Sequence, residues 1–121
     1  MNDDTMEAKV AVVILNWNGA EMLRRFLPSV VCNSAGVGID VYVADNASTD
    51  NSLDILANEF PAVRTIVLEK NYGFADGYNK ALKEVKAEYY VLLNSDVEVT
   101  EHWLEPMVSY LDEHQEIAAC Q

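Results

Sequence analysis

Asparagine, aspartate and serine gather at four points of this sequence, each directly after a short apolar run. The apolar runs end at Leu15, Ala44, Leu68 and Leu93, and the polar loops that follow span residues 16–19, 45–50, 69–79 and 94–98. Turn chemistry alone favours such residues, so any single loop is uninformative. Four loops of this kind at one edge of a sheet would form a concave rim of oxygen atoms. Such a rim suits a hydroxyl-rich ligand together with a hard divalent cation.

Alternating strands and helices are needed to bring these loops together. Apolar runs predict strands at Val10–Leu15, Val41–Ala44, Val63–Leu68 and Tyr89–Leu93. Amphipathic stretches predict helices at Ala20–Val31, Asn51–Phe60, Phe74–Lys86 and from Thr100, as the cap, to about His114. The pattern therefore predicts an α/β fold, a Rossmann-like, doubly wound and mostly parallel sheet. Ligands of such sheets bind beyond the carboxyl ends of the strands.

Prolines and caps set the expected ends of these helices. Pro28 is expected to kink the first helix or end it early, and Pro61 to break the second. Asp50 is a good N-cap for the second helix. Ile117–Cys120 starts a further apolar segment, and apolar surface around it would be compatible with a homodimer.

Length and charge limit the classes of function that this protein can have. The 121 residues predict one domain over residues 9–121, preceded by a disordered tail at residues 1–8. The net charge of −12 argues against binding to nucleic acid or to an anionic membrane surface. No Lys or Arg follows Lys86. The acidic residues beyond Lys86 either form a solvated surface or, around Asp96, attract a divalent cation.

Processing signals and cysteines point to a cytoplasmic protein. The polar N-terminus is no signal peptide, and no apolar run approaches the ~20 residues of a membrane span. Cys32 and Cys120 form no CxxC pair and fit a reducing compartment. We therefore expect a cytoplasmic protein, either free or peripheral at the inner face of the membrane.

Several enzyme classes are excluded by missing motifs. A dinucleotide-binding domain needs GxGxxG after the first strand, where this chain has NWNGAE. P-loop, GxSxG and HExxH motifs are also absent, as is the Gly-rich, basic first loop of a sugar nucleotidyltransferase.

Four segments carry a resemblance to a known family: LNWNG, VADNASTDNS, NYGFADGYNKAL and YYVLLNSDVEV. In this order and spacing, the sequence from about Lys9 to Gln121 resembles the nucleotide-sugar-binding half of the inverting family 2 glycosyltransferases. Within that family it is most similar to the rhamnosyltransferase-like branch. The resemblance implies a GT-A fold that binds a dTDP- or UDP-linked sugar together with Mg²⁺ or Mn²⁺.

The resemblance also implies roles for individual side chains. Asp45 matches the acid that hydrogen-bonds the pyrimidine or its ribose. The residues implied to contact the nucleotide in the first two loops are Asn16, Asn18, Asn46 and Ser48. Those implied to line the base and diphosphate are Asn71, Gly73, Phe74, Gly77 and Asn79.

The segment Asn94-Ser95-Asp96 matches the metal motif of the family, which is commonly Asp-x-Asp. Asn94 replaces the first Asp, and an amide oxygen ligates a cation without bringing a charge. We therefore expect Asp96 to carry the metal and Asn94 to assist.

Three other residues each have a functional and a structural interpretation. Trp17 would stack on a base or pack over the sheet edge, and packing is expected. His102 would be a metal ligand or a surface residue, and a surface residue is expected. Lys70 would neutralise a phosphate or remain solvated, and it is not assigned to the site.

The implied reaction is inverting, metal-dependent transfer of a sugar to a saccharide or lipid-linked acceptor in cell-surface polysaccharide synthesis. Such transfer needs a general base, which in the family comes from the acceptor half, after the metal motif. We expect that half, and the base, to lie beyond Gln121, so the chain alone is expected to be inactive. The alternative is a non-catalytic domain that binds a nucleotide sugar or a partner.

Overall fold

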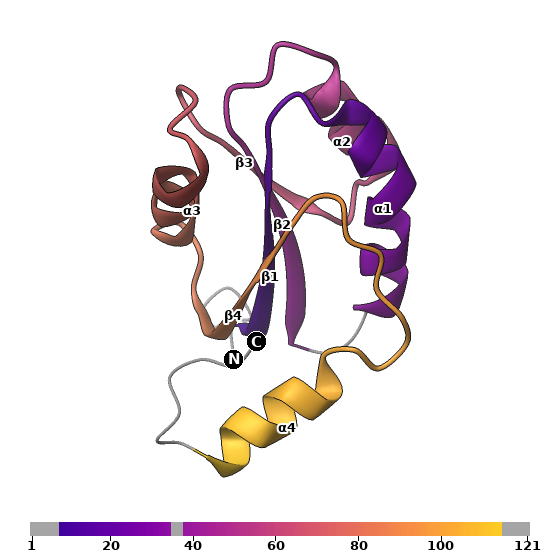
Figure 1. Cartoon of the computed structure of the whole chain (residues 1–121), viewed down its shortest axis with the longest axis vertical. Coiled ribbons are helices and arrows are strands. Elements are labelled where there is room, and N and C mark those ends of the chain that lie inside the picture. The colour runs from indigo at the N-terminus through magenta and orange to yellow at the C-terminus, as the bar shows by residue number, and fades with distance from the viewer. Residues whose placement is uncertain (1–7, 35–37, 115–121) are drawn as a thin grey trace, which may run out of the picture.

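The computed structural model describes residues 8–34 and 38–114. Within them, strands and helices alternate along the chain (Figure 1). The strands are β1 (Ala8–Asn16), β2 (Ile39–Asp45), β3 (Arg64–Val67) and β4 (Ala87–Leu93). The helices are α1 (Ala20–Asn33), α2 (Ser52–Glu59), α3 (Phe74–Leu82) and α4 (Glu105–Glu113).

The strands form one parallel sheet in the order β3-β2-β1-β4. Helices α1 and α2 cover one face and α3 covers the other, whereas α4 lies near the end of the sheet where β1 begins (Figure 1). This arrangement confirms the predicted doubly wound α/β fold. Because β1 is flanked by β2 and β4, the strand order changes direction beside it, and such switch points are where open α/β sheets bind ligands.

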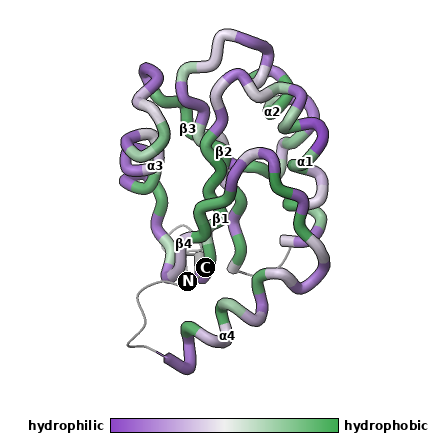
Figure 2. Tube along the Cα trace, in the orientation of Figure 1, coloured by the Kyte–Doolittle hydropathy of each residue, from purple (hydrophilic) through white to green (hydrophobic). Residues whose placement is uncertain are grey.

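The side chains of β1 divide the core into two layers. Val10, Val12 and Ile14 pack in the layer beneath α1 and α2, and Ala11 and Val13 pack in the layer beneath α3. Successive strand residues point to opposite faces, so a strand covered on both faces needs a continuous apolar run. Figure 2 shows the resulting apolar centre, with the polar residues gathered on the loops and outer helix faces.

Three helix ends differ from the sequence predictions by more than one residue. Helix α1 continues past Pro28 to Asn33, so of the two predicted effects of Pro28, a kink or an early end, the early end is wrong. Pro28 is exposed, while Leu23, Leu27 and Val30 are buried and hold the helix on the sheet. A proline removes one backbone hydrogen bond, and this burial outweighs that loss.

The last two helices are shorter than expected. Helix α3 ends at Leu82 instead of Lys86, and tight turns carry the chain from there to Val85, which is buried. Helix α4 begins at Glu105, with Pro106 in its first turn, so Thr100 does not cap it. Proline is favoured at this helix position because its missing N–H would have no partner there.

Some predictions fall outside the described residues. They concern residues 1–7 of the predicted tail, the segment at residues 117–120 and Cys120. Ala8, the last residue of the predicted tail, instead begins β1. Cys32 is a free, exposed cysteine. None of the described helices is both long enough and apolar enough to span a bilayer.

Candidate functional site

Asp45, the last residue of β2, is the centre of a hydrogen-bond network at the carboxyl edge of the sheet. Its Oδ1 accepts hydrogen bonds from Asn16 Nδ2 at 3.0 Å and from Ser48 Oγ at 2.7 Å. Its Oδ2 accepts a hydrogen bond from the Ser48 backbone N–H at 3.0 Å. Asn16 pairs with Asp45 in the register of β1 and β2. The carboxylate, which is 0% exposed, thus joins the ends of two neighbouring strands.

Asn16 is also buried, and the nitrogen and oxygen of its side-chain amide differ in their hydrogen bonding. Nδ2 donates to Asp45 and, at 3.3 Å, to Ser48 Oγ. Oδ1 has no hydrogen-bond partner among the described residues. A Cβ atom at Gly19 would overlap that oxygen. The first loop therefore requires glycine at position 19, so that the chain can pass close to Asn16 and enter α1.

Asn18 fastens the first loop to the second. Its Oδ1 accepts hydrogen bonds from the backbone N–H groups of Thr49 at 2.7 Å and Asp50 at 3.2 Å. In return, its own backbone N–H donates to Ser48 Oγ at 2.8 Å. Asn18 has a φ of 49°, in the left-handed region that asparagine tolerates better than most residues. Hydrogen bonds thus run in both directions between the loop after β1 and the loop after β2.

Asp50 ties together the first turns of α1 and α2. Its Oδ2 accepts from the backbone N–H of Ala20 at 3.2 Å, and its Oδ1 accepts from the backbone N–H of Ser52 at 2.9 Å. Burial raises the pKa of Asp50, but the hydrogen bonds from Ser52 and Ala20 outweigh it and place the pKa below the ordinary 3.8. The N-cap of α2 is Asn51 and not Asp50 as predicted, because α2 begins one residue later, at Ser52. Asp50 nevertheless accepts from the first backbone N–H of each helix.

Asn46 organises the loop on the opposite face of the sheet. Its Oδ1 accepts the Tyr72 backbone N–H at 2.9 Å, and its Nδ2 donates to Asn71 Oδ1 at 3.2 Å and to the Gly73 carbonyl at 3.0 Å. Asn71 Oδ1 in turn accepts the Gly73 N–H at 2.8 Å. Asn46 is 2% exposed, so its amide is used to fix the entry into α3.

Two glycines shape the start of α3. Gly73 has a φ of 82° and a ψ of −169°, a combination essentially restricted to glycine. Gly77 is buried, and a Cβ there would lie 2.9 Å from Leu15 Cδ2 and 3.1 Å from Asn46 Nδ2. The missing side chain allows α3 to approach the end of β1.

Aromatic side chains are exposed close to these loops. Trp17 is 56% exposed and Phe74 is 68% exposed, although both are large apolar groups. The expectation that Trp17 packs over the sheet is therefore wrong, because Trp17 is exposed in the loop between β1 and α1. Phe74 makes an edge-to-face contact with Tyr78, with ring centroids 5.1 Å apart. Exposed rings of this kind are available to stack on a planar ligand.

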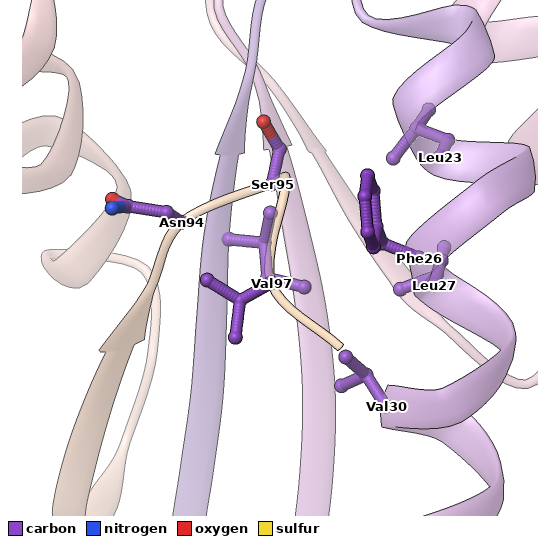
Figure 3. Close-up of a pocket in the computed structure, with 8 residues that line it drawn as sticks. Leu23, Phe26, Leu27, Val30, Asn94, Ser95 and Val97 are labelled. Atoms are coloured by element: carbon purple, nitrogen blue, oxygen red, sulfur yellow. The ribbon is translucent and has the colours of Figure 1, made fainter. Parts of the chain in front are cut away.

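The predicted metal loop follows β4 directly. Leu93 pairs with Ile14 of β1, so Asn94 begins beside the carboxyl end of β1. Asn94 and Asp96 are both exposed. Asn94 points away from α1, whereas a shallow apolar crevice separates the loop from that helix (Figure 3). The oxygen atoms of this loop are therefore accessible next to the switch point.

The donor set of this loop fits a cation that is shared with a ligand. Residues 8–34 and 38–114 contain no group of three or more His, Cys, Asp or Glu side chains that could hold a metal ion. Mg²⁺ in proteins is commonly bound by one or two carboxylates, with phosphate and water oxygens completing the shell. Asp96 and Asn94 supply such a partial set. His102 is exposed and pairs with Glu105, as expected for a surface residue.

The predicted site residues thus separate into two groups. Those held in the two polar networks or packed against them are Asn16, Asn18, Asp45, Asn46, Ser48, Asn71, Gly73 and Gly77. Those exposed outside the networks are Phe74, Asn79, Asn94 and Asp96. Sequence reasoning missed Gly19 and the contact of Asp50 with α1. The sequence signals available were the glycine before the first helix and the acid before the second.

Comparison with known proteins identifies relatives. The family described as "Glycosyl transferase family 2" matches residues 11–121. The poly(ribitol-phosphate) beta-N-acetylglucosaminyltransferase TarP of Staphylococcus aureus is 33% identical over 106 residues, which is 84% of this chain and 32% of TarP. The chain spans about a third of the length of the curated relatives it matches.

Solved structures show the same fold. The crystal structure of S. aureus TarS 1–349 in complex with UDP matches 88% of this chain and 33% of that chain, with a TM-score of 0.76 and 25% identity. The mannosyltransferase PcManGT from Pyrobaculum calidifontis, in complex with GDP-Man and Mn²⁺, matches 90% of this chain and 34% of that chain. Its TM-score is 0.74 at 23% identity, a likeness of fold. The predicted GT-A architecture is confirmed by these neighbours.

Proposed function

The chain belongs to glycosyltransferase family 2, and on that premise we propose that it is the nucleotide-sugar-binding part of an inverting, metal-dependent glycosyltransferase. The proposed donor is a UDP- or dTDP-linked sugar, and the rhamnosyltransferase-like resemblance implies dTDP-rhamnose. The proposed acceptor is a saccharide or lipid-linked saccharide of cell-surface polysaccharide synthesis. The name of TarP contains a polymer, poly(ribitol-phosphate), and a polymeric acceptor is in keeping with this proposal.

The observation that carries the proposal is the pair of polar networks at the carboxyl ends of β1 and β2. The Asp45 network joins the loops that lead into α1 and α2, and the Asn46 network fixes the entry to α3. The exposed loop that contains Asp96 follows β4, which pairs with β1 in the same sheet. Loops fixed in this way bind with less loss of conformational entropy than free loops. The rim is therefore organised before a ligand arrives.

The proposed roles combine the accessibility of each residue with the family resemblance. Trp17 and Phe74 are exposed and are proposed to cover the faces of the base. Asp45 is proposed to anchor the base or ribose, by a direct hydrogen bond or by holding the loops that make one. Asn79 and the first turn of α3 are proposed to face the diphosphate.

In the proposed reaction, the acceptor hydroxyl attacks the anomeric carbon from the side opposite to the nucleoside diphosphate. A general base takes the hydroxyl proton as the new glycosidic bond forms and the bond to the diphosphate breaks. We place that base in the acceptor-binding part, as the family resemblance implies. A divalent cation at Asp96 and Asn94 would supply positive charge where the leaving diphosphate gains negative charge.

The test of this proposal measures metal-dependent binding of UDP and dTDP by calorimetry. Wild type is expected to bind a nucleoside diphosphate more tightly with Mn²⁺ than with EDTA, and Asp96→Asn should remove the difference. Asn94→Asp should increase the difference, because it adds a negative charge to the donor set.

Glu113→Gln is the matched control, since it removes one charge from the exposed helix α4. It should leave the Mn²⁺ effect unchanged. A wild-type chain that binds neither nucleotide contradicts the proposed function. A chain that binds equally well with Mn²⁺ and EDTA contradicts the metal role alone.

A further inference from the structure

The segment after the metal loop is fastened to α1 through both backbone groups of one residue. The Val99 N–H donates to Ser29 Oγ at 3.1 Å, and Asn33 Nδ2 donates to the Val99 carbonyl at 3.0 Å. Ser29 and Asn33 are four residues apart, so they lie on the same side of the helix, one turn apart. Side chains of α1 therefore satisfy both backbone hydrogen-bonding groups of Val99.

The orientation of Ser29 is itself fixed. Its hydroxyl donates to the Phe26 carbonyl at 3.0 Å, so an oxygen lone pair is left to accept the Val99 N–H. Val99 is 8% exposed and packs in the core layer beneath α1. Further along the segment, Trp103 Nε1 donates to Ser34 Oγ at 3.0 Å. Three hydrogen bonds and the buried side chain of Val99 thus hold this segment against α1 and its C-cap residue, Ser34.

The other end of the metal loop is held from the opposite face of the sheet. The Leu93 carbonyl accepts a hydrogen bond from the Tyr78 hydroxyl of α3 at 3.0 Å. Residues 94–98 therefore run between two fixed points, Leu93 and Val99, with Asp96 at their middle. Asn94 and Asp96 themselves are exposed, so the position of their oxygen atoms depends on these attachments.

We propose that Ser29 and Asn33 are positioning residues for the metal loop. The proposal rests on the proposed function, because it takes Asp96 and Asn94 as the metal-binding groups. Neither Ser29 nor Asn33 touches the ligand in this proposal. They restrict the loop to the arrangement in which its oxygen atoms meet a cation and a diphosphate together. A loop released from α1 would have to be ordered when the cation binds, which weakens binding.

The test separates metal-dependent from metal-independent binding. The affinity of the 121-residue chain for UDP is measured by calorimetry with Mn²⁺ and with EDTA, in wild type, Ser29→Ala and Asn33→Ala. We expect the Mn²⁺ enhancement to fall by about two- to tenfold in each variant, the cost of one ordinary hydrogen bond. Affinity in EDTA should stay within about twofold of wild type, because that binding does not use the loop.

Matched variants separate positioning from general stability. Ser29→Thr keeps the hydroxyl and should restore the enhancement. Asn33→Asp keeps the side-chain size but cannot donate to the Val99 carbonyl, so it replaces Asn33→Ala if that variant does not fold. Asn58→Ala changes an exposed asparagine of α2 and should behave as wild type.

The outcomes distinguish this proposal from the function on which it rests. A wild type without Mn²⁺ enhancement overturns the metal role itself. A wild type with enhancement, and variants that keep it in full, overturns the positioning role alone. Equal losses of affinity with and without Mn²⁺ also overturn it, because they indicate a general loosening of the site.

Discussion

Replacing Asp45 by alanine tests the central network directly. The variant leaves three protein donors without their acceptor: Asn16 Nδ2, the Ser48 hydroxyl and the Ser48 backbone N–H. An unsatisfied buried donor costs about 1–3 kcal/mol. Asn16 Nδ2 keeps its contact with Ser48 Oγ, and the Ser48 hydroxyl can rotate, so part of the cost is recovered. We therefore expect Asp45→Ala to lower the free energy of unfolding by about 2–4 kcal/mol.

The same variant should weaken nucleotide binding. Loss of one charge-assisted hydrogen bond costs about 1.5–3 kcal/mol, or roughly ten- to a hundredfold in affinity. Urea denaturation measures the stability change, and calorimetric titration of UDP and dTDP, at a temperature where the variant is folded, measures the affinity. Asp54→Ala is the control, because Asp54 is exposed on α2.

Ser48→Ala determines how Asp45 acts on the nucleotide. It removes one donor from Asp45 Oδ1 and the acceptor of the Asn18 N–H. If Asp45 binds the base directly, Ser48→Ala should preserve affinity. If Asp45 acts by holding the loops, both variants should weaken binding. An Asp45→Ala chain with wild-type stability and wild-type affinity would refute the reasoning from the network.

Two further predictions concern packing and pH. Gly77→Ala should lower the free energy of unfolding by about 1–3 kcal/mol despite the better helix propensity of alanine, because its Cβ would lie 2.9 Å from Leu15 Cδ2. Urea denaturation measures this, with the exposed helix substitution Ala57→Gly as the comparison for propensity alone, and a stabilised variant would contradict the close contact. The pKa of Asp50 lies below its ordinary 3.8, so its contribution to stability is fully present above that value and is lost as the pH falls through the folded-state value. Wild type should therefore lose more stability than Asp50→Asn between about pH 5 and pH 2.5, and parallel pH profiles would count against the role of Asp50.

The sequence was sufficient to predict the fold because burial on two faces leaves a strong pattern. The continuous apolar run at Val10–Leu15 belongs to the central strand, and its residues alternate between the two core layers. Helix ends were less predictable. Pro28 and Thr100 carry local signals for a helix boundary, yet packing of α1 on the sheet and the position of Pro106 determined the actual ends. Local propensity is a weak signal wherever tertiary contacts oppose it.

The location of the candidate site could be predicted from the sequence, but the contacts within it could not. Parallel strands bring their carboxyl ends to one edge, so polar loops after successive strands had to meet there. The same oxygen and amide groups that would bind a sugar nucleotide also stabilise turns, and sequence alone does not separate the two uses. Asp45 and Asn46 are adjacent in sequence, yet they serve loops on opposite faces of the sheet, since neighbouring strand residues point to opposite sides. Their side chains are buried and hydrogen-bonded within the protein, whereas Asp96 and Phe74 are exposed. The buried side chains therefore fix the arrangement of the loops, and under the proposed function the exposed ones are the groups most accessible to a ligand.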